Sequence, residues 1–197
     1  MRHLYILSLI LCLQTTSYAL VNTESLRHSN QPGIQHFFSL DMSFQSGNNT
    51  FSSLAPKYTL YVTPKHSHFR GFFYSTLDQA THDHKKIRNK HFIHFRLMQV
   101  LRPTLESEYF IQQQANSFLN MSSRYVTGLA LRRYLRQGDQ PFIVATGLMF
   151  EQESYLNSTE STQLRSSTYI IFKNNIFSTS TLNTITYIQP KLDDIND

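Results

Sequence analysis

The chain has 197 residues, a formal net charge of +5 and a single cysteine. This length is that of one domain, and its basic residues are scattered rather than gathered in one stripe, which argues against a nucleic-acid-binding protein. One cysteine cannot build a disulfide framework, so the small disulfide-stapled secreted modules are excluded as well.

The first nineteen residues are typical of a secretory signal peptide. A short basic start precedes an apolar stretch over 4–13, and Ser17 and Ala19 supply the small residues at the −3 and −1 positions of a cleavage site. The apolar stretch is too short for a helix that spans a bilayer, which needs about 20 residues. We expect Sec-type export of a bacterial protein, cleavage near Ala19, and a single mature domain over 20–197.

Runs rich in Phe, Tyr, Ile, Thr and Val follow, separated by turn-forming residues such as Gly47-Asn48-Asn49 and Gly138-Asp139. They predict about nine antiparallel strands, and two longer polar stretches, 79–90 and 154–162, are predicted to be loops. The expected strands are 34–46, 51–63, 68–78, 91–102, 105–117, 123–137, 140–153, 163–174 and 177–190.

Within several runs, apolar residues alternate with polar or small ones. Over 123–137, for example, Leu129 and Leu131 alternate with Ala130 and Arg132, and alternate side chains of a strand point to opposite faces of the sheet. One face of the sheet is therefore predicted to be apolar and the other to carry the charged side chains. The same alternation recurs in 34–46, 91–102 and 140–153.

A soluble sandwich and a membrane barrel both produce this alternation, but strand length favours the barrel. The runs are long enough for spanning strands of about 9–11 residues, whereas ordinary strands average about 5–6. We therefore predict an all-β, antiparallel, up-and-down membrane β-barrel of the bacterial outer membrane. Its expected partners are outer-membrane lipid and the barrel-assembly machinery, with no nucleic acid. A soluble secreted β-sandwich binding module remains the alternative.

One set of segments is distinctive in its order and spacing: 21–27, 46–50, 108–118, Arg124, 128–133, 147–151, Arg165, Tyr169 and 186–190. Together these segments resemble the family of the domain of unknown function 481, which occurs in salt-induced outer-membrane proteins. The resemblance covers most of the mature chain and implies a membrane β-barrel without an established activity. Members of that family continue with further strands, so the resemblance also implies a barrel that is incomplete at its C-terminus.

On consecutive predicted strands, several charged and amide side chains lie at the alternate positions that point into the interior of the predicted barrel. Because neighbouring strands lie about 4.8 Å apart, Glu108 and Glu151 are expected to pair with Arg124 and Arg132. Two interpretations stay open: a polar lining that selects a small solute, or an ion-pair network that fills a narrow barrel. The candidate residues are Glu108, Gln112, Arg124, Arg132, Glu151 and Arg165.

Other chemistry finds little support in the sequence. The pairs His66/His68 and His82/His84 could offer imidazole to a metal, but no recognised ligand spacing completes them, and solvated histidines are the simpler interpretation. No Gly-x-Ser-x-Gly elbow is present, so a lipid-modifying enzyme is a minor alternative. We predict no enzymatic activity, no catalytic or metal-binding residues and no cofactor.

Overall fold

The computed structural model describes residues 23–27, 32–156, 158, 160–177 and 179–192, so the expected signal peptide lies outside the described residues. Ten strands form one antiparallel sheet, which confirms the predicted all-β fold. The elements are η1 (Thr23–Leu26), β1 (Gly33–Gln45), β2 (Phe51–Thr63), β3 (Phe69–His82), β4 (Lys85–Arg102), β5 (Leu105–Asn116), η2 (Ser117–Leu119), β6 (Met121–Arg136), β7 (Phe142–Tyr155), β8 (Ser161–Ser166), β9 (Thr168–Phe177) and β10 (Ser180–Ile188).

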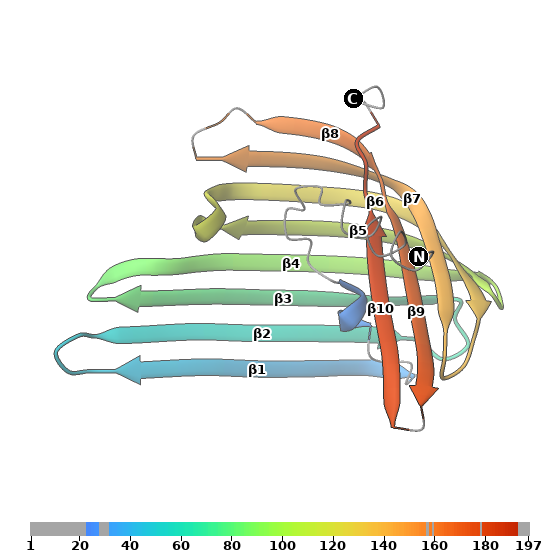
Figure 1. Ribbon diagram of the computed structural model, residues 1–197, viewed down its shortest axis with the longest axis horizontal. Helices are drawn as coiled ribbons and strands as arrows, with labels where there is room; N and C mark the ends of the chain where they lie inside the picture. The colour runs from blue at the N-terminus through green and yellow to red at the C-terminus, as the bar shows by residue number, and fades with distance from the viewer. Residues whose placement is uncertain (1–22, 28–31, 157, 159, 178, 193–197) are drawn as a thin grey trace, which may run out of the picture.

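The strands follow one another as an up-and-down meander from β1 to β7 and then through β9 to β10 (Figure 1). The register is long and regular, as in the first hairpin, where pairing runs from Gly33↔Thr63 to Gln45↔Phe51. Within the described residues no ladder joins β1 to β10. The sheet is thus a curled meander with β1 at one edge and β10 at the other.

The eighth predicted strand is divided at Ser167 into β8 and β9, which raises the count from nine to ten. β8 pairs with the second half of β7, from Leu148 to Glu153, and β9 pairs with its first half. The N–H of Ser167 donates to the carbonyl of Gly147 at 2.8 Å, at the point where β7 changes partner. The sheet therefore turns a corner here.

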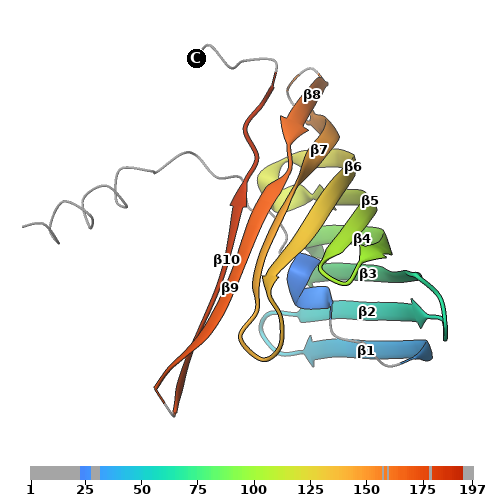
Figure 2. The ribbon, with the colours of Figure 1, turned by 90° about the vertical axis from the view of Figure 1, so that its right-hand side faces the viewer.

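Two glycines allow β6 and β7 to approach closely at this corner. A Cβ on Gly147 would overlap the carbonyl oxygen of Leu129, and one on Gly128 would lie 2.7 Å from the carbonyl oxygen of Leu148. Glycine is the residue that such close backbone approaches and barrel corners require. Beyond the corner, β9 and β10 cross over the face of the earlier strands, and η1 lies between the two layers (Figures 1 and 2).

The prediction of a loop over 79–90 is wrong, because β3 continues to His82 and β4 begins at Lys85, with a tight turn between them. Asp83 and His84 form the turn with φ of 48° and 61°, the left-handed values that two-residue hairpins favour. These strand ends are polar on both faces, so no hydrophobic alternation marked them. Backbone pairing continues regardless, supported by a cross-strand ion pair of 2.7 Å between Arg88 Nε and Asp78.

The predicted alternation of the two faces is confirmed in the central strands. On the convex face Leu129 and Leu131 are 63% and 51% exposed, whereas Arg132 on the concave face is 3% exposed. In β4, Phe95 is likewise exposed and its neighbour Arg96 is buried. In these strands the sheet therefore buries charged side chains on its concave face and exposes apolar side chains on its convex face. One apolar cluster supports the corner: Ile143, Ala145, Tyr169 and Ile171.

Candidate functional site

The concave face holds two groups of paired charges. Alternation within the strands brings the strand residues there, since each of them has the parity opposite to the exposed Leu, Ile and Phe side chains, whereas Glu24 and Arg27 come from η1 and the residue that follows it. We name them the central cluster and the distal cluster. The central cluster consists of Glu24, Arg27, Arg70, Arg96, Glu106, Glu108 and Arg132, and the distal cluster of Arg124, Glu151, Glu153 and Arg165.

Glu24 is at the centre of the central cluster although it belongs to η1 and not to the sheet. Its Oε1 accepts from Nη1 of Arg96 at 2.5 Å, and its Oε2 accepts from Nη1 of Arg132 at 2.6 Å. Nη2 of Arg96 also donates to Thr23 Oγ1 at 2.7 Å. Burial alone would raise the pKa of Glu24, but the guanidinium groups of Arg27, Arg96 and Arg132 hold it well below its usual range. The carboxylate is therefore ionised at neutral pH.

Glu108 is the second carboxylate of the central cluster and is 2% exposed. Its oxygens lie 3.3 Å from Arg96 Nη1 and 3.7 Å from Arg132 Nη1, and Arg27 also contacts it. The hydroxyl of Tyr169, from β9, donates to Glu108 Oε2 at 2.8 Å. Glu108 thus ties η1 and β9 to the middle of the sheet.

Glu106, at the start of β5, is the third carboxylate of the central cluster. It contacts Arg70, lies 3.5 Å from Arg27 Nη1, and accepts from the hydroxyl of Tyr134 at 3.2 Å. The carbonyl oxygen of Leu26 accepts from Tyr61 at 2.5 Å. The segment Thr23–Arg27 is therefore held against the concave face at both of its ends.

The distal cluster is independent of η1. Arg124 on β6 contacts Glu151 on β7 and lies 2.9 Å from Glu153, and Nε of Arg165 on β8 lies 3.0 Å from Glu151. Pairing between neighbouring strands places these groups opposite one another, as in Arg124↔Glu153. An ion pair buried in this way needs both partners, because removing one leaves an uncompensated charge.

The structure brings the candidate residues from the sequence to the concave face, but into two clusters. The sequence predicted that Glu108 and Glu151 pair with Arg124 and Arg132; in the structure Glu108 lies near Arg132 and Glu151 contacts Arg124. Arg165 joins the distal cluster. Gln112 takes part in no ion pair and donates to Gln114 at 3.2 Å.

Sequence reasoning missed the residues that complete the central cluster. The alternation over 91–102 places Arg96 on the charged face, but Arg96 was not among the candidate residues. Glu24 and Arg27 follow the predicted cleavage site and lie outside every predicted strand, so no periodicity indicated that they return to the interior. The other omissions are Arg70 and Glu106, which lie near strand ends.

Among the described residues, no group of three or more His, Cys, Asp or Glu side chains could hold a metal ion. His94, the most buried histidine of the described residues, lies among aromatic rings; its ring centroid is 5.5 Å from that of Phe72 and 6.4 Å from that of Phe110. No helix in the described ranges is long and apolar enough to cross a membrane.

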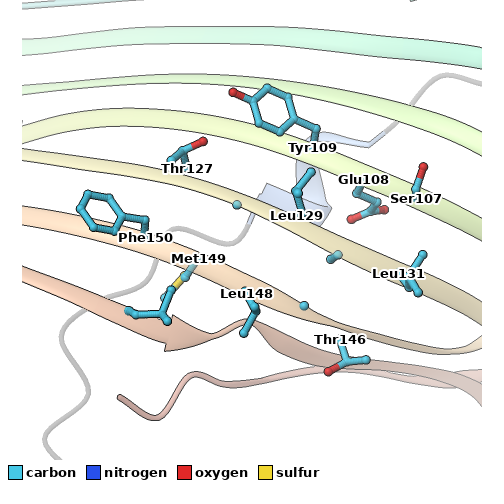
Figure 3. A pocket seen from close by; sticks show the side chains of 14 residues that line it. Ser107, Glu108, Tyr109, Thr127, Leu129, Leu131, Thr146, Leu148, Met149 and Phe150 are labelled. Atoms are coloured by element: carbon cyan, nitrogen blue, oxygen red, sulfur yellow. The ribbon is translucent and has the colours of Figure 1, made fainter. Parts of the chain in front are cut away.

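A groove of about 630 Å³ lies over β5–β7 (Figure 3). Its walls include the convex-face side chains Tyr109, Leu129, Leu148 and Phe150. The residues around it also include Glu108 of the central cluster. The surface of the groove is almost entirely apolar, so it belongs to the exposed hydrocarbon surface of the sheet.

No family model, no curated protein and no solved structure matches the chain.

Proposed function

We propose that this chain is a β-barrel protein of the bacterial outer membrane, with a structural or small-solute role and no enzymatic activity. The observation that carries the proposal is the inverted polarity of the sheet. Side chains such as Leu129, Leu148 and Phe150 are about half exposed on the convex face, while Arg132 and Glu151 are buried on the concave face.

This polarity suits a bilayer better than water. Outer-membrane strands alternate between apolar residues that face lipid and polar residues that face the interior. A monomeric soluble protein rarely exposes a contiguous apolar patch larger than a few hundred Å², yet exposed apolar side chains cover strand after strand of the convex face. They include Leu54, Phe69, Ile93, Phe95, Leu97, Ile111, Leu129, Leu131, Leu148, Phe150 and Leu164.

Strand length supports the same proposal. The strands from β1 to β7 have 12 to 18 residues, more than the 9–11 or so that a tilted transmembrane strand needs. The additional residues of β3 and β4 next to their connecting turn are mostly polar, as expected where the chain would leave the hydrocarbon core of the bilayer. The partners in this proposal are outer-membrane lipid and the barrel-assembly machinery, reached by export through the signal peptide.

The proposal is tested by locating the protein in fractionated bacterial cells with the variant Leu129→Arg beside the parent chain. The parent should sediment with outer membranes and resist extraction by carbonate or urea. Arginine near the middle of a bilayer costs roughly 2–4 kcal/mol, so Leu129→Arg should assemble poorly. Ser158→Arg, in the exposed connection after β7, is the matched control and should assemble normally.

The competing function is a soluble secreted binding module. It would place the parent protein in the periplasmic fraction, and both arginine variants would then behave alike because the convex face would be in water. That outcome would overturn the outer-membrane proposal.

A further inference from the structure

The two arginines that hold Glu24 come from the sheet, whereas Glu24 comes from a short segment outside it. Arg96 lies on β4 and Arg132 on β6, two strands apart. Their Nη1 atoms donate hydrogen bonds to the two different oxygens of the Glu24 carboxylate, at 2.5 Å and 2.6 Å. The two arginines of this site therefore belong to the sheet, whereas the carboxylate that they bind belongs to η1.

Aromatic rings fix both guanidinium groups. The Cζ of Arg96 lies 5.8 Å from the ring centre of Phe72 and 5.7 Å from that of Phe110. The Cζ of Arg132 lies 5.3 Å from the ring centre of Tyr134 and 5.6 Å from that of Tyr169. Such cation–π contacts hold a guanidinium in place, so the two arginines are preorganised for an anion.

The charge of the central cluster also favours an anion. Four arginines face three glutamates, which leaves one positive charge in excess. The Nε–H groups of Arg96 and Arg132 have no acceptor among the residues that the structure describes. A small cavity of about 40 Å³ adjoins Arg96 and Thr23. Without the carboxylate of Glu24, two buried guanidinium groups would lose a partner, which is costly.

We infer that Arg96 and Arg132 form a carboxylate-binding site that Glu24 fills from within the chain, and that a small free carboxylate binds there when the Glu24 side chain is removed. Without the Glu24 side chain, the site would accept a solute with a compact carboxylate group. This inference goes beyond the outer-membrane proposal and does not depend on it, because the site lies on the concave face whichever solvent covers the convex one.

Acetate is the appropriate probe because Glu24→Ala removes a methylene and a carboxylate, which are the atoms that acetate supplies. The Tm of the full-length variant is measured at pH 7 in sodium acetate and in sodium chloride of equal ionic strength. We expect Glu24→Ala to have a lower Tm than the parent chain and acetate to raise it saturably. Glu160→Ala, which removes an exposed carboxylate, is the matched control and should respond equally to both salts.

The double variant Glu24→Ala/Arg132→Gln locates the binding site and should lose the acetate response. If Glu24→Ala does not fold in chloride, its refolding from urea is compared in the two salts, and recovery in acetate alone supports the inference. An equal Tm in both salts, failure to refold in both, or an undiminished response of the double variant would each overturn it. None of these results depends on where the protein is located in the cell.

Discussion

Tyr169 and Glu108 are 61 residues apart in the chain, and the hydroxyl of Tyr169 donates a hydrogen bond of 2.8 Å to the Glu108 carboxylate. The same hydroxyl accepts from Arg132 Nη1 at 2.8 Å. Through this one group, β9 is joined to β5 and β6 across the concave interior. The layer formed by β9 and β10 is therefore attached to the sheet by polar contacts as well as by the corner at Gly147.

Tyr169→Phe should destabilise the protein by about 1.5–3 kcal/mol, because it removes hydrogen bonds to two charged groups and leaves both buried. The free energy of unfolding is measured from denaturant titrations of the two proteins. Tyr125→Phe is the control, since Tyr125 lies on the convex face and is half exposed. Equal losses in the two variants would show that the Tyr169 hydroxyl contributes nothing specific.

Gly147→Ala should destabilise the corner of the sheet by about 1–3 kcal/mol, the usual cost of forcing extra atoms into a packed site. The added methyl would overlap the carbonyl oxygen of Leu129, which is backbone and cannot turn aside. Gly47→Ala is the matched control, because a Cβ there meets no atom within 4 Å. Denaturation midpoints distinguish the two, and a harmless Gly147→Ala would contradict the close approach of β6 and β7.

Glu151→Ala should cost about 3–5 kcal/mol, since it leaves the guanidinium groups of Arg124 and Arg165 uncompensated in the interior. The comparison is Asp41→Ala, which breaks the exposed pair of 2.9 Å with Lys57 and should cost no more than about 1 kcal/mol. Unfolding free energies provide the test. A loss at Glu151 as small as that at Asp41 would mean that water reaches the distal cluster freely.

Asp83 should make the stability of the β3–β4 turn depend on pH. The hydrogen bond from the Thr50 N–H lowers the pKa of Asp83 below its ordinary value in the folded protein. The resulting stabilisation is fully present above the unfolded pKa of about 3.9 and is lost as the pH falls through the lower folded value. Unfolding curves from pH 7 to pH 2 test this against Asp83→Asn, which keeps a residue that tolerates positive φ.

The advantage of the parent chain over Asp83→Asn should be constant near neutral pH and shrink only under acid conditions. An advantage that grows as the pH falls would have the wrong sign for a carboxyl group with a lowered pKa. An advantage that does not change with pH would mean that the variant acts through the geometry of the turn rather than through its charge.

The sequence by itself determined the all-β fold, the strand runs and the division of each central strand into two faces. These features are local, since a period of two between Leu129, Leu131 and Arg132 can be seen without knowing the partner strand. Pairing of Glu108 and Glu151 with Arg124 and Arg132 could be predicted for the same reason, because neighbouring strands of a meander are paired in order. Only the register in the structure shows that Glu151 contacts Arg124 and that Glu108 lies near Arg132.

Only the tertiary structure decided what lies inside the curled sheet. At the corner, Gly147 of β7 lies against β6, and Ser167, between β8 and β9, donates to the Gly147 carbonyl. A glycine in a strand pattern does not reveal which backbone approaches it. Glu24 belongs to no periodic element, so its placement between Arg96 and Arg132 depends on long-range electrostatics. Charges that are buried together stabilise one another only after the sheet has brought them into contact, and no local pattern in the chain records that pairing.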